Sequence, residues 1–515
     1  ATNIEFLIEY SKKKALEFEE NYNKAVEIAN QRNLPISGER DGYSFALVGY
    51  DEELDVLKYN RTFNNNEPGS SIQTINAKAV QDLGIIGTGY KVGVWDGGVG
   101  LTGHLAFTGG RYVVKDNGNT PSSITTDGRS HAAHVAGTVA AGNFGSGLAK
   151  GLAPGSQVYA YNWFSDESEM ASAAANTTNP IYVSNHSYGL DAYGYLQNGG
   201  SASIFGQYNS DARSIDIIAN NAPFYTIVFA AGNDRNPATN QGGMNFNPTR
   251  NFKDLLSQGG VSKNTVVVAN TRGTDTYTGI TGPQSVSLQN PFIARSSSYG
   301  PTDDFRIKPD ISAKGTDVFS IDIDHNGDTS TKSGTSMAAP SVTGGFVLWQ
   351  DYYNQLFGTQ MRSSTVRGLM AHTAREAGPA LGPDFMFGFG LLNIGAGKEL
   401  MDLVTEDLAK IAEFDLPQGT TMTYDFTYTG LEPLKATLAW NDPAASSSTQ
   451  NNQNIKRIVN DLDIKVVNLD TNQEYFPWAL NQDFSLTHTS TNIAIRTGQN
   501  NRDNIEKVEV NSTVP

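Results

Sequence analysis

The sequence predicts an α/β protein with a mostly parallel central sheet flanked by helices, preceded by a small α+β segment and followed by a β-rich domain. Between about residues 75 and 400, short apolar runs alternate with stretches that are long enough for crossover helices. Before this region an apolar pattern at helical spacing lies among many charges, and after about residue 405 apolar residues recur with a period of two. Because 515 residues exceed one ordinary core, we expect domains over residues 1–70, 71–404 and 405–515.

The first of these domains begins with an amphipathic helix. Apolar residues at helical spacing predict it over about residues 4–32, and Pro35 ends it. Alternation over residues 43–48 predicts a strand. Residues 61–71, with consecutive asparagines and a Pro-Gly pair, predict a flexible connection of the kind that proteases cut. We interpret residues 1–70 as a pro-region or an N-terminal extension.

Apolar runs in the second domain predict the strands of the central sheet. Residues 163–170 follow one of these runs and carry several acidic side chains. We interpret them as the start of a helix rather than as the wall of a substrate groove. The predicted strands cover residues 92–95, 158–161, 181–185, 227–230 and 266–270.

The run from Ser333 to Pro340 predicts a tight turn that presents one hydroxyl at the start of a helix. Gly334 allows the turn without Cβ strain, and Pro340 is tolerated in a first helical turn because the N–H groups there lack partners. Ser336 is a candidate nucleophile, since a negative oxygen beside it would meet unpaired N–H groups and a favourable helix dipole. A serine that merely caps the helix is the alternative.

Two upstream segments supply partners for this serine. Residues 91–98 predict a short strand that ends in Asp96, at the sheet edge where open α/β proteins bind their ligands. Residues 127–141 predict a turn and a helix of small residues, with His131 at its exposed start. His134 lies about one turn deeper and is interpreted as a buried, hydrogen-bonded core residue.

The order Asp96, His131, Ser336 and the motifs around these residues resemble the subtilisin-like serine proteases. The second motif reads His-Ala-Ala-His-Val-Ala-Gly-Thr where that family usually has His-Gly-Thr-His-Val-Ala-Gly-Thr, and Gly97 stands where a serine or threonine is common. The resemblance covers about residues 75–400 and implies a subtilisin-like fold. Further matches, in the same order along the chain, are residues 151–154, 187–189, 229–233 and 308–311.

The resemblance implies a role for each matching residue. Asp96, His131 and Ser336 correspond to a catalytic triad, and the Asn233 side chain corresponds to the group that completes the oxyanion hole with the Ser336 N–H. His131 would take the proton of Ser336 and return it to the leaving amine, while Asp96 holds the imidazole tautomer. The implied activity is that of a secreted serine endopeptidase acting on proteins or peptides. The implied substrate-binding residues are Ser187, Tyr188, Gly189, Ala230, Ala231 and Gly232.

Other chemistries fit the sequence less well. An α/β-hydrolase would need a second glycine after the serine and a histidine later in the chain. The sedolisin proteases use acidic residues in place of His131 and Asn233, and a zinc site lacks both the H-E-x-x-H spacing and any cysteine. His186 lies beside the substrate edge and is interpreted as a packed structural residue. A catalytically silent binding or adhesion module is the alternative function, although such a module needs none of the four catalytic groups.

Composition narrows the possible partners and the setting. The formal charge of −16 and the sequence pI of about 4.9 disfavour nucleic acid and anionic membranes. The chain has no cysteine, which excludes disulfides and thiol catalysis, and no apolar run of about 18 residues that would span a membrane. It begins without an initiator methionine, so we expect that a leader has been removed. We expect an extracellular location and no organic cofactor, and the oligomeric state is left open.

The residues after about 405 predict a β-sandwich of the jelly-roll kind. Residues 438–442 and 459–463 resemble the C-terminal β-sandwich of one branch of the subtilisin-like enzymes. That family often binds calcium, which prefers carboxylate and carbonyl oxygens. Asp442, Asp461 and Asp463 are the candidate calcium ligands. Strands are expected over residues 421–428, 436–440, 464–468 and 507–510.

Overall fold

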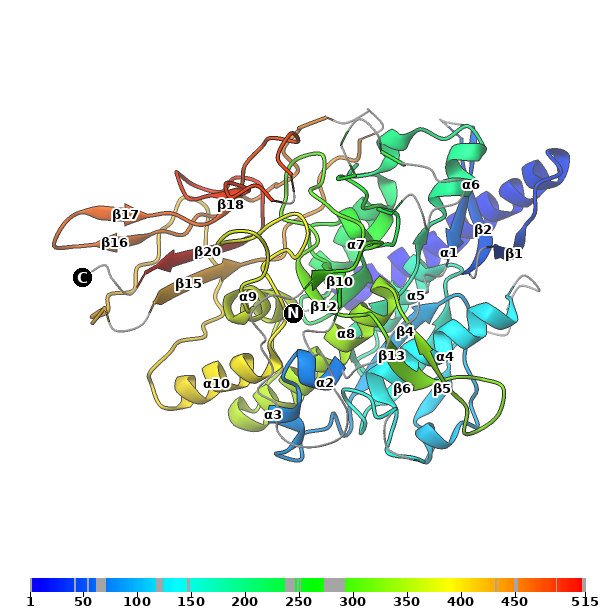
Figure 1. Ribbon diagram of the computed structural model, residues 1–515, viewed down its shortest axis with the longest axis horizontal. Coiled ribbons are helices and arrows are strands. Elements are labelled where there is room, and N and C mark those ends of the chain that lie inside the picture. The colour runs from blue at the N-terminus through cyan, green and yellow to red at the C-terminus, as the bar shows by residue number, and fades with distance from the viewer. Residues whose placement is uncertain are drawn as a thin grey trace.

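Figure 1 shows the computed structural model, with the N-terminal helix and strands at one end, the central sheet in the middle and the C-terminal strands at the other end. The segment 62–70, most of the connection expected after the N-terminal domain, lies outside the described residues. The described residues are 2–40, 43–52, 55–61, 71–116, 124–145, 149–236, 246–247, 250, 252–272, 292–430, 433–448, 453–487 and 489–511.

The central sheet of the described chain is almost entirely parallel. Its strands are β4 (Lys91–Asp96), β5 (Tyr112–Val114), β6 (Gln157–Asn162), β7 (Ile181–His186), β9 (Thr226–Ala230), β10 (Val266–Arg272), β11 (Phe292–Ile293) and β12 (Ile311–Lys314). The order is β11-β10-β9-β7-β4-β6-β5, and β12 pairs with β10. Only the pair of β10 and β11 is antiparallel. The predicted α/β class and the five predicted strands are confirmed, because parallel strands buried on both faces read as continuous apolar runs.

Helices cover both faces of this sheet. Val92 and Val94 of β4 belong to the core shared with α4 (Thr126–Ala140) and α8 (Thr335–Phe357). Trp95 belongs to the core shared with α5 (Asp166–Ala174) and α7 (Ser210–Asn221). This division follows from the strand, whose successive side chains point to opposite faces. The remaining helices are α2 (Ser71–Thr74), α3 (Lys78–Gln81), α6 (Ala192–Gln197), α9 (Ser363–Thr373) and α10 (Ile394–Thr405), and a hairpin is formed by β13 (Val318–Ile321) and β14 (Thr329–Lys332).

The N-terminal elements form a small α+β unit, as predicted. Helix α1 (Ile4–Gln31) packs on the antiparallel strands β1 (Ser37–Arg40), β2 (Tyr43–Asp51) and β3 (Val56–Arg61). Its Ala25 and Ala29 meet Phe45 and Leu47 in one core. The aromatic residues Phe18 and Tyr22 pack against Phe164, which lies two residues before the start of α5. Strand β3 continues the sheet onto β8 (Gly189–Leu190) of the central region.

The C-terminal residues form separate two-stranded antiparallel sheets in the described chain. Three of the four expected strands, 436–440, 464–468 and 507–510, overlap β15, β16 and β20, but residues 421–428 form none. Met422, Tyr424 and Phe426 of that segment are 46%, 46% and 58% exposed, so its alternating pattern has no buried face to occupy. The β-sandwich itself stays a prediction. The strands are β15 (Leu434–Ala439), β16 (Val466–Asn468), β17 (Gln473–Tyr475), β18 (Ala479–Leu480), β19 (Ala494–Ile495) and β20 (Ile505–Val510).

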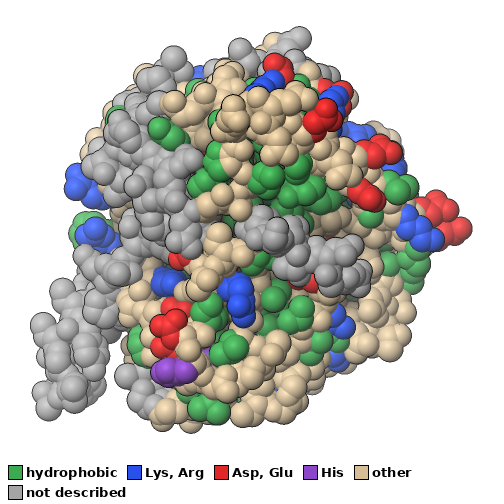
Figure 2. All heavy atoms as spheres, turned by 90° about the vertical axis from the view of Figure 1, so that its right-hand side faces the viewer, with side chains coloured by type: hydrophobic (Ala, Val, Ile, Leu, Met, Phe, Trp, Pro, Cys, Tyr) green, Lys and Arg blue, Asp and Glu red, His purple; other side chains and the backbone are tan. Residues whose placement is uncertain are grey.

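Charged side chains of both signs lie on the face drawn in Figure 2. On the face in Figure 2, lysine and arginine side chains of the described residues are interspersed with acidic ones rather than gathered into one basic area. Among the helices in the described part of the chain, none combines the length and the hydropathy that crossing a membrane requires.

A partly buried pair of carboxyl groups, Glu169 and Asp116, lies between α5 and the end of β5. Glu169 accepts a hydrogen bond from the indole N–H of Trp95 at 3.0 Å. Its acidic neighbour Asp116 accepts the N–H of Asn162 at 2.9 Å. Burial is the main reason that the pKa of Glu169 is raised to about 10, and the charge of Asp116 is the next. The folded chain therefore holds a proton on Glu169 that the unfolded chain releases.

We expect the Glu169→Gln variant to lose less folding stability than the parent when the pH is raised into the alkaline range. Because the pKa of Glu169 is about 10 in the folded chain and ordinarily 4.5, its contribution to stability is fully present below pH 4.5 and is lost as the pH rises through about 10. Thermal melts at about pH 6 and about pH 9 check this, and the variant should gain several degrees relative to the parent at the higher pH. Glu399→Gln, at an exposed position of α10, is the matched control. An equal shift for both variants would contradict the prediction.

Candidate active site

Asp96 and His131 form a buried hydrogen-bonded pair at the carboxyl end of β4. The Nδ1 of His131 lies 2.6 Å from the Oδ1 of Asp96, and neither side chain has exposed surface. The same oxygen accepts the N–H of Gly97 at 2.6 Å. Burial raises the pKa of Asp96, while the two donors oppose that rise. Since the carboxylate is an acceptor, His131 carries its proton on Nδ1 and presents Nε2 as a lone pair.

Small residues allow α4 to bring His131 against the end of β4. Thr125 caps this helix, because its hydroxyl oxygen accepts the N–H of Gly128 at 3.0 Å. A Cβ on Gly128 would lie 2.4 Å from the carbonyl oxygen of Gly97, so a side chain would force the helix away. The expectation that His131 is exposed is wrong. Every residue from His131 to Ala140 is buried, since α4 packs along its length against β4, β13 and α8.

Ser336 lies in the first turn of α8, directly after the turn at Gly334. Its hydroxyl donates to the carbonyl oxygen of Ser187 at 2.9 Å. The Nε2 of His131 is buried and has no hydrogen-bond partner among the described residues. In this structure the hydroxyl is therefore bonded to Ser187 and not to His131.

The register of β4 and β7 places Asp96 and Ser187 at one edge of the sheet, where Ser187 also contacts Ser336. Trp95 pairs with His186 in the parallel ladder of β4 and β7, so Asp96 and Ser187, the next residue of each segment, leave the sheet side by side. Two hydrogen bonds hold Ser336 beside Ser187. The Ser336 hydroxyl donates to the Ser187 carbonyl oxygen, and the Ser187 hydroxyl donates to the Ser336 carbonyl oxygen at 2.9 Å. Residues that are far apart in the chain therefore meet at the carboxyl ends of parallel strands.

Asn233 is fixed by the residue that precedes the serine. Its Oδ1 accepts the N–H of Thr335 at 3.2 Å and the Thr335 hydroxyl at 3.3 Å. The Thr335 hydroxyl oxygen in turn accepts the N–H of Gly232 at 3.1 Å. With the Asn233 oxygen held in this way, its NH₂ group points away from Thr335. The sequence analysis missed Thr335, although its place next to Ser336 in the motif is a signal that could have been used.

The six predicted substrate-binding residues lie together at the ends of β7 and β9. These strands are neighbours, with His186 opposite Phe229, so the segments 187–189 and 230–232 leave the sheet side by side. Tyr188 is buried, and its hydroxyl donates to a carboxylate oxygen of Asp166 at 2.6 Å. The main chain of Gly189 is already paired with another strand, because Gly189 lies in antiparallel register with Arg61 of β3.

Two further histidines are structural, as predicted. Burial lowers the pKa of both His134 and His186 to about 3, so both are neutral near pH 7. The Nε2 of His134 lies 2.9 Å from the carbonyl oxygen of Val318. His186 stacks between Trp95 and Phe229, with ring centroids 5.1 and 4.6 Å away.

Two of the three candidate calcium ligands, Asp442 and Asp461, have other partners. Asp442 is buried in an ion pair with Lys263 and accepts two backbone N–H groups. Asp461 lies 2.5 Å from the ammonium group of Lys456. Among the described residues, no group of three or more histidine, aspartate or glutamate side chains is arranged to hold a metal ion. These carboxylates therefore do not fit a calcium site, and calcium elsewhere in the chain stays a prediction.

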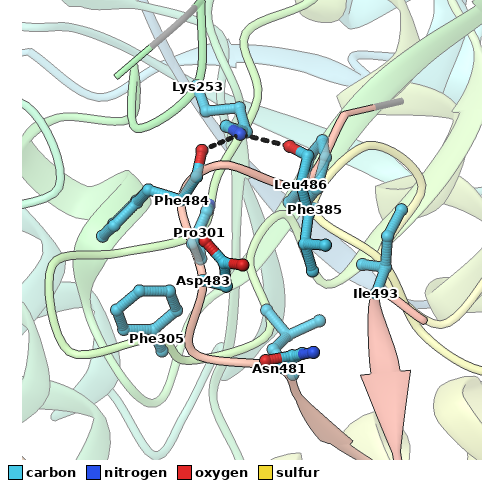
Figure 3. Close-up of a pocket in the computed structure, with 10 residues that line it drawn as sticks. Lys253, Pro301, Phe305, Phe385, Asn481, Asp483, Phe484, Leu486 and Ile493 are labelled. Carbon is cyan, nitrogen blue, oxygen red and sulfur yellow. Dashed lines mark hydrogen bonds between the residues drawn. The ribbon is translucent and has the colours of Figure 1, made fainter. Parts of the chain in front are cut away.

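A small pocket lies away from these residues, where Lys253, Pro301 and Phe305 meet C-terminal residues that include Leu480, Phe484 and Ile493 (Figure 3). Phe305, Phe385 and Phe484 are among its lining side chains. The ammonium group of Lys253 donates to the carbonyl oxygens of Phe484 and Leu486. None of the predicted catalytic residues lines this pocket.

Known proteases resemble this chain over about two thirds of its length. A thermostable alkaline protease of Halalkalibacterium halodurans is 28% identical over 325 residues, which cover 63% of this chain and 72% of that protein. Subtilisin DY of Bacillus licheniformis is 27% identical over 334 residues, 64% of this chain and 97% of that protein. A serine protease/ABC transporter B family protein of Dictyostelium discoideum is 24% identical, and the chain spans about a quarter of it, 25%.

The family assignment rests on the match to a family model. The model of the subtilase family matches residues 87–390, which is more than half of the 515 residues. This range contains Asp96, His131, Asn233 and Ser336, whereas the N-terminal unit and the C-terminal sheets lie outside it. The chain therefore belongs to the subtilase family and is a subtilisin-like serine protease.

Proposed function

We propose that this chain is an endopeptidase that hydrolyses peptide bonds through an acyl-enzyme on Ser336, with Asp96 and His131 as the other members of its triad. The observation that carries the proposal is the buried pair in which Asp96 fixes one nitrogen of His131 while the other nitrogen has no partner among the described residues. The structural residue His134 also has one nitrogen without a partner among the described residues, but its other nitrogen contacts a carbonyl oxygen, whereas that of His131 is held by a carboxylate that can stabilise an imidazolium. Here the second nitrogen remains a base.

The chemistry follows from these contacts. The Ser336 hydroxyl leaves the Ser187 carbonyl oxygen, turns to His131 and gives its proton to Nε2 as the oxygen attacks the carbonyl carbon. Asp96 stabilises the imidazolium that forms. When the C–N bond breaks, His131 returns this proton to the leaving amine. Water, deprotonated by His131 in the same way, then releases the acyl group from Ser336.

Asn233 and the start of α8 are suited to hold the tetrahedral oxyanion. Thr335 keeps the Oδ1 of Asn233 occupied, so that the NH₂ group is left to donate to the substrate oxygen. The N–H of Ser336 belongs to the first helical turn, where N–H groups lack intrahelical partners. Two fixed donors beside the attacked carbon lower the energy of the oxyanion more than that of the ground-state carbonyl.

The alternative function is that of a silent binding module. A binding module gains nothing from a buried, unpaired base next to a serine at a helix start. The extracellular location, a structural calcium ion and the membership in the branch with a C-terminal β-sandwich are further proposals, which rest on the resemblance. Comparing thermal melts with and without a calcium chelator tests the calcium proposal.

Labelling with a serine-directed phosphonate tests the proposed mechanism. We expect one phosphonyl group per active molecule, located on Ser336 by mass spectrometry of the digested chain, together with loss of peptidase activity. Ser341, a buried serine of the same helix, is the internal control and should stay unlabelled. Peptide hydrolysis that persists after complete labelling of Ser336, or a label on another serine, would contradict the assignment.

The N-terminal unit is proposed to be an inhibitory pro-region. The pairing of β3 with Gly189 and Leu190 supports this, because an extended segment of the chain itself covers the edge that substrate would need. Contacts between α1 and α5 also fix the N-terminal unit on the catalytic domain. Lys14 lies 2.6 Å from the carboxylate of Glu167, and Ser11 donates to the carbonyl oxygen of Ser168 at 2.7 Å.

We expect the full chain to cut itself within residues 62–70. N-terminal sequencing after incubation should find a new N-terminus in this range, where the composition is that of a flexible connection. The appearance of peptidase activity should follow the cut or the separation of the two fragments. If the activity of the uncut chain already equals that of the cut chain, the pro-region proposal is wrong.

A further inference from the structure

Strand β3 lies where an extended peptide would lie along the proposed substrate edge. Asn60 and Arg61 pair with Leu190 and Gly189, and the carbonyl oxygen of Tyr59 accepts the N–H of Asp191 at 2.8 Å. These are main-chain contacts, which any extended peptide can make. The side chains of β3 therefore occupy the positions that the side chains of a substrate bound in the same way would occupy.

Alternate residues of β3 face the catalytic domain. Leu57 and Tyr59 point the other way, into the core of the N-terminal unit. Val56 packs in a cluster with Leu190 and other residues of the catalytic domain. Each residue two positions further on faces the same side.

Lys58 is the charged residue on this face of β3. Its ammonium nitrogen lies 3.4 Å from the Oδ1 of Asp211, and the two side chains are 20% and 27% exposed. Asp211 belongs to the first turn of α7, and the same oxygen accepts the hydroxyl of Ser210 at 3.2 Å. The carboxylate of Asp211 is the main reason that the pKa of Lys58 is raised.

Asp211 belongs to an acidic patch of the catalytic domain, which we define as Asp166, Glu167 and Asp211. Lys14 of α1 pairs with Glu167, and Asp166 accepts the hydroxyl of Tyr188 from the substrate edge. The N-terminal unit thus sets Lys14 and Lys58 against this patch. When the unit leaves, the patch loses both cations.

We infer that Asp211 is a specificity-determining residue, which favours peptide substrates with lysine or arginine at the position that Lys58 occupies, three residues before the one that pairs with Gly189. This inference rests on the proposed function. A cation from the substrate would restore the charge balance of the patch while the main-chain ladder holds the register. Neighbouring positions on the opposite face of the strand would gain nothing from a cation.

Competition between peptides in one tube tests the inference. The first peptide has the sequence of residues 55–72, which contains the whole range in which the cut is expected. The second has norleucine in place of Lys58, and the third has in addition lysine in place of Leu57, on the opposite face. The full chain is used as it is. The ratio of two kcat/KM values measured together does not depend on the fraction of active enzyme, so a partly latent preparation is sufficient.

We expect the first peptide to be hydrolysed about two- to fivefold faster than the second and the third at low ionic strength, as for a partly exposed ion pair. The preference should vanish at about 1 M salt. It should also vanish in Asp211→Asn and persist in Asp402→Asn, which makes the same change on α10 beside Lys398. Equal hydrolysis of all three peptides by the parent chain would overturn the inference and leave the proposed function intact. If no peptide is hydrolysed, the proposed function fails first, and this inference fails with it.

Discussion

Ser336→Ala is expected to lower kcat for peptide hydrolysis by about six orders of magnitude, a value taken over from the corresponding serine of subtilisin. Without the hydroxyl no acyl-enzyme can form, although His131 and the oxyanion donors remain. The fold should persist, since the variant loses one neutral hydrogen bond to Ser187, which contributes about 1 kcal/mol. Active-site titration and progress curves with a fluorogenic peptide measure the loss. Thermal melts measure the stability.

Ser341→Ala is the matched control for this prediction. Ser341 lies in the same helix, and its hydroxyl donates to the carbonyl oxygen of Met337 at 3.2 Å, within the helix. Its replacement should leave kcat within about twofold of the parent value. The Ser336→Ala chain should also remain uncut during incubation, if the cut within residues 62–70 is made by the enzyme itself. Activity of Ser336→Ala close to that of Ser341→Ala would exclude the proposed nucleophile.

Asp442→Ala is expected to lower the free energy of unfolding by about 3–5 kcal/mol, because it leaves a buried ammonium group without its counter-ion. The ammonium group of Lys263 contacts the Asp442 carboxylate and the carbonyl oxygens of Pro443 and Arg457. Both side chains of the ion pair are 0% exposed. This pair joins the catalytic domain to the C-terminal region.

Two more groups lose a partner in that variant. The Asp442 carboxylate also accepts the N–H of Val459 at 2.8 Å and the N–H of Asn460 at 2.7 Å. Buried N–H groups without acceptors cost further free energy. Replacing both members of the pair, as Lys263→Met with Asp442→Leu, should therefore recover only part of the loss, since the two N–H groups remain unpaired.

Denaturant unfolding in a Ser336→Ala background measures this effect without self-digestion. Glu474→Ala is the control, because Glu474 forms an exposed ion pair with Lys465, with side chains 42% and 49% exposed. Such pairs contribute about 0–1 kcal/mol. If Asp442→Ala destabilises the chain no more than Glu474→Ala does, the interdomain ion pair is not the anchor that its burial indicates.

Local patterns were sufficient for the strands and for the catalytic motif. An apolar run such as residues 266–270 has to be buried on both faces, so its place in a parallel sheet follows from composition. The small residues around His131 have to pack closely, and Gly128 shows why, since a side chain there would collide with Gly97. The same reasoning failed for residues 421–428, because alternation predicts a strand but does not supply a partner strand.

The sequence by itself determined the α/β class and the family and supplied the candidate residues for acyl transfer, because each depends on residue types at short spacing. Only the tertiary structure decided which distant groups meet. It turned the Ser336 hydroxyl toward Ser187, gave Asp442 a lysine partner 179 residues away instead of a metal ion, and laid β3 along the edge at Gly189. Contacts of this kind depend on how separate elements pack, and no local pattern encodes the distance between them.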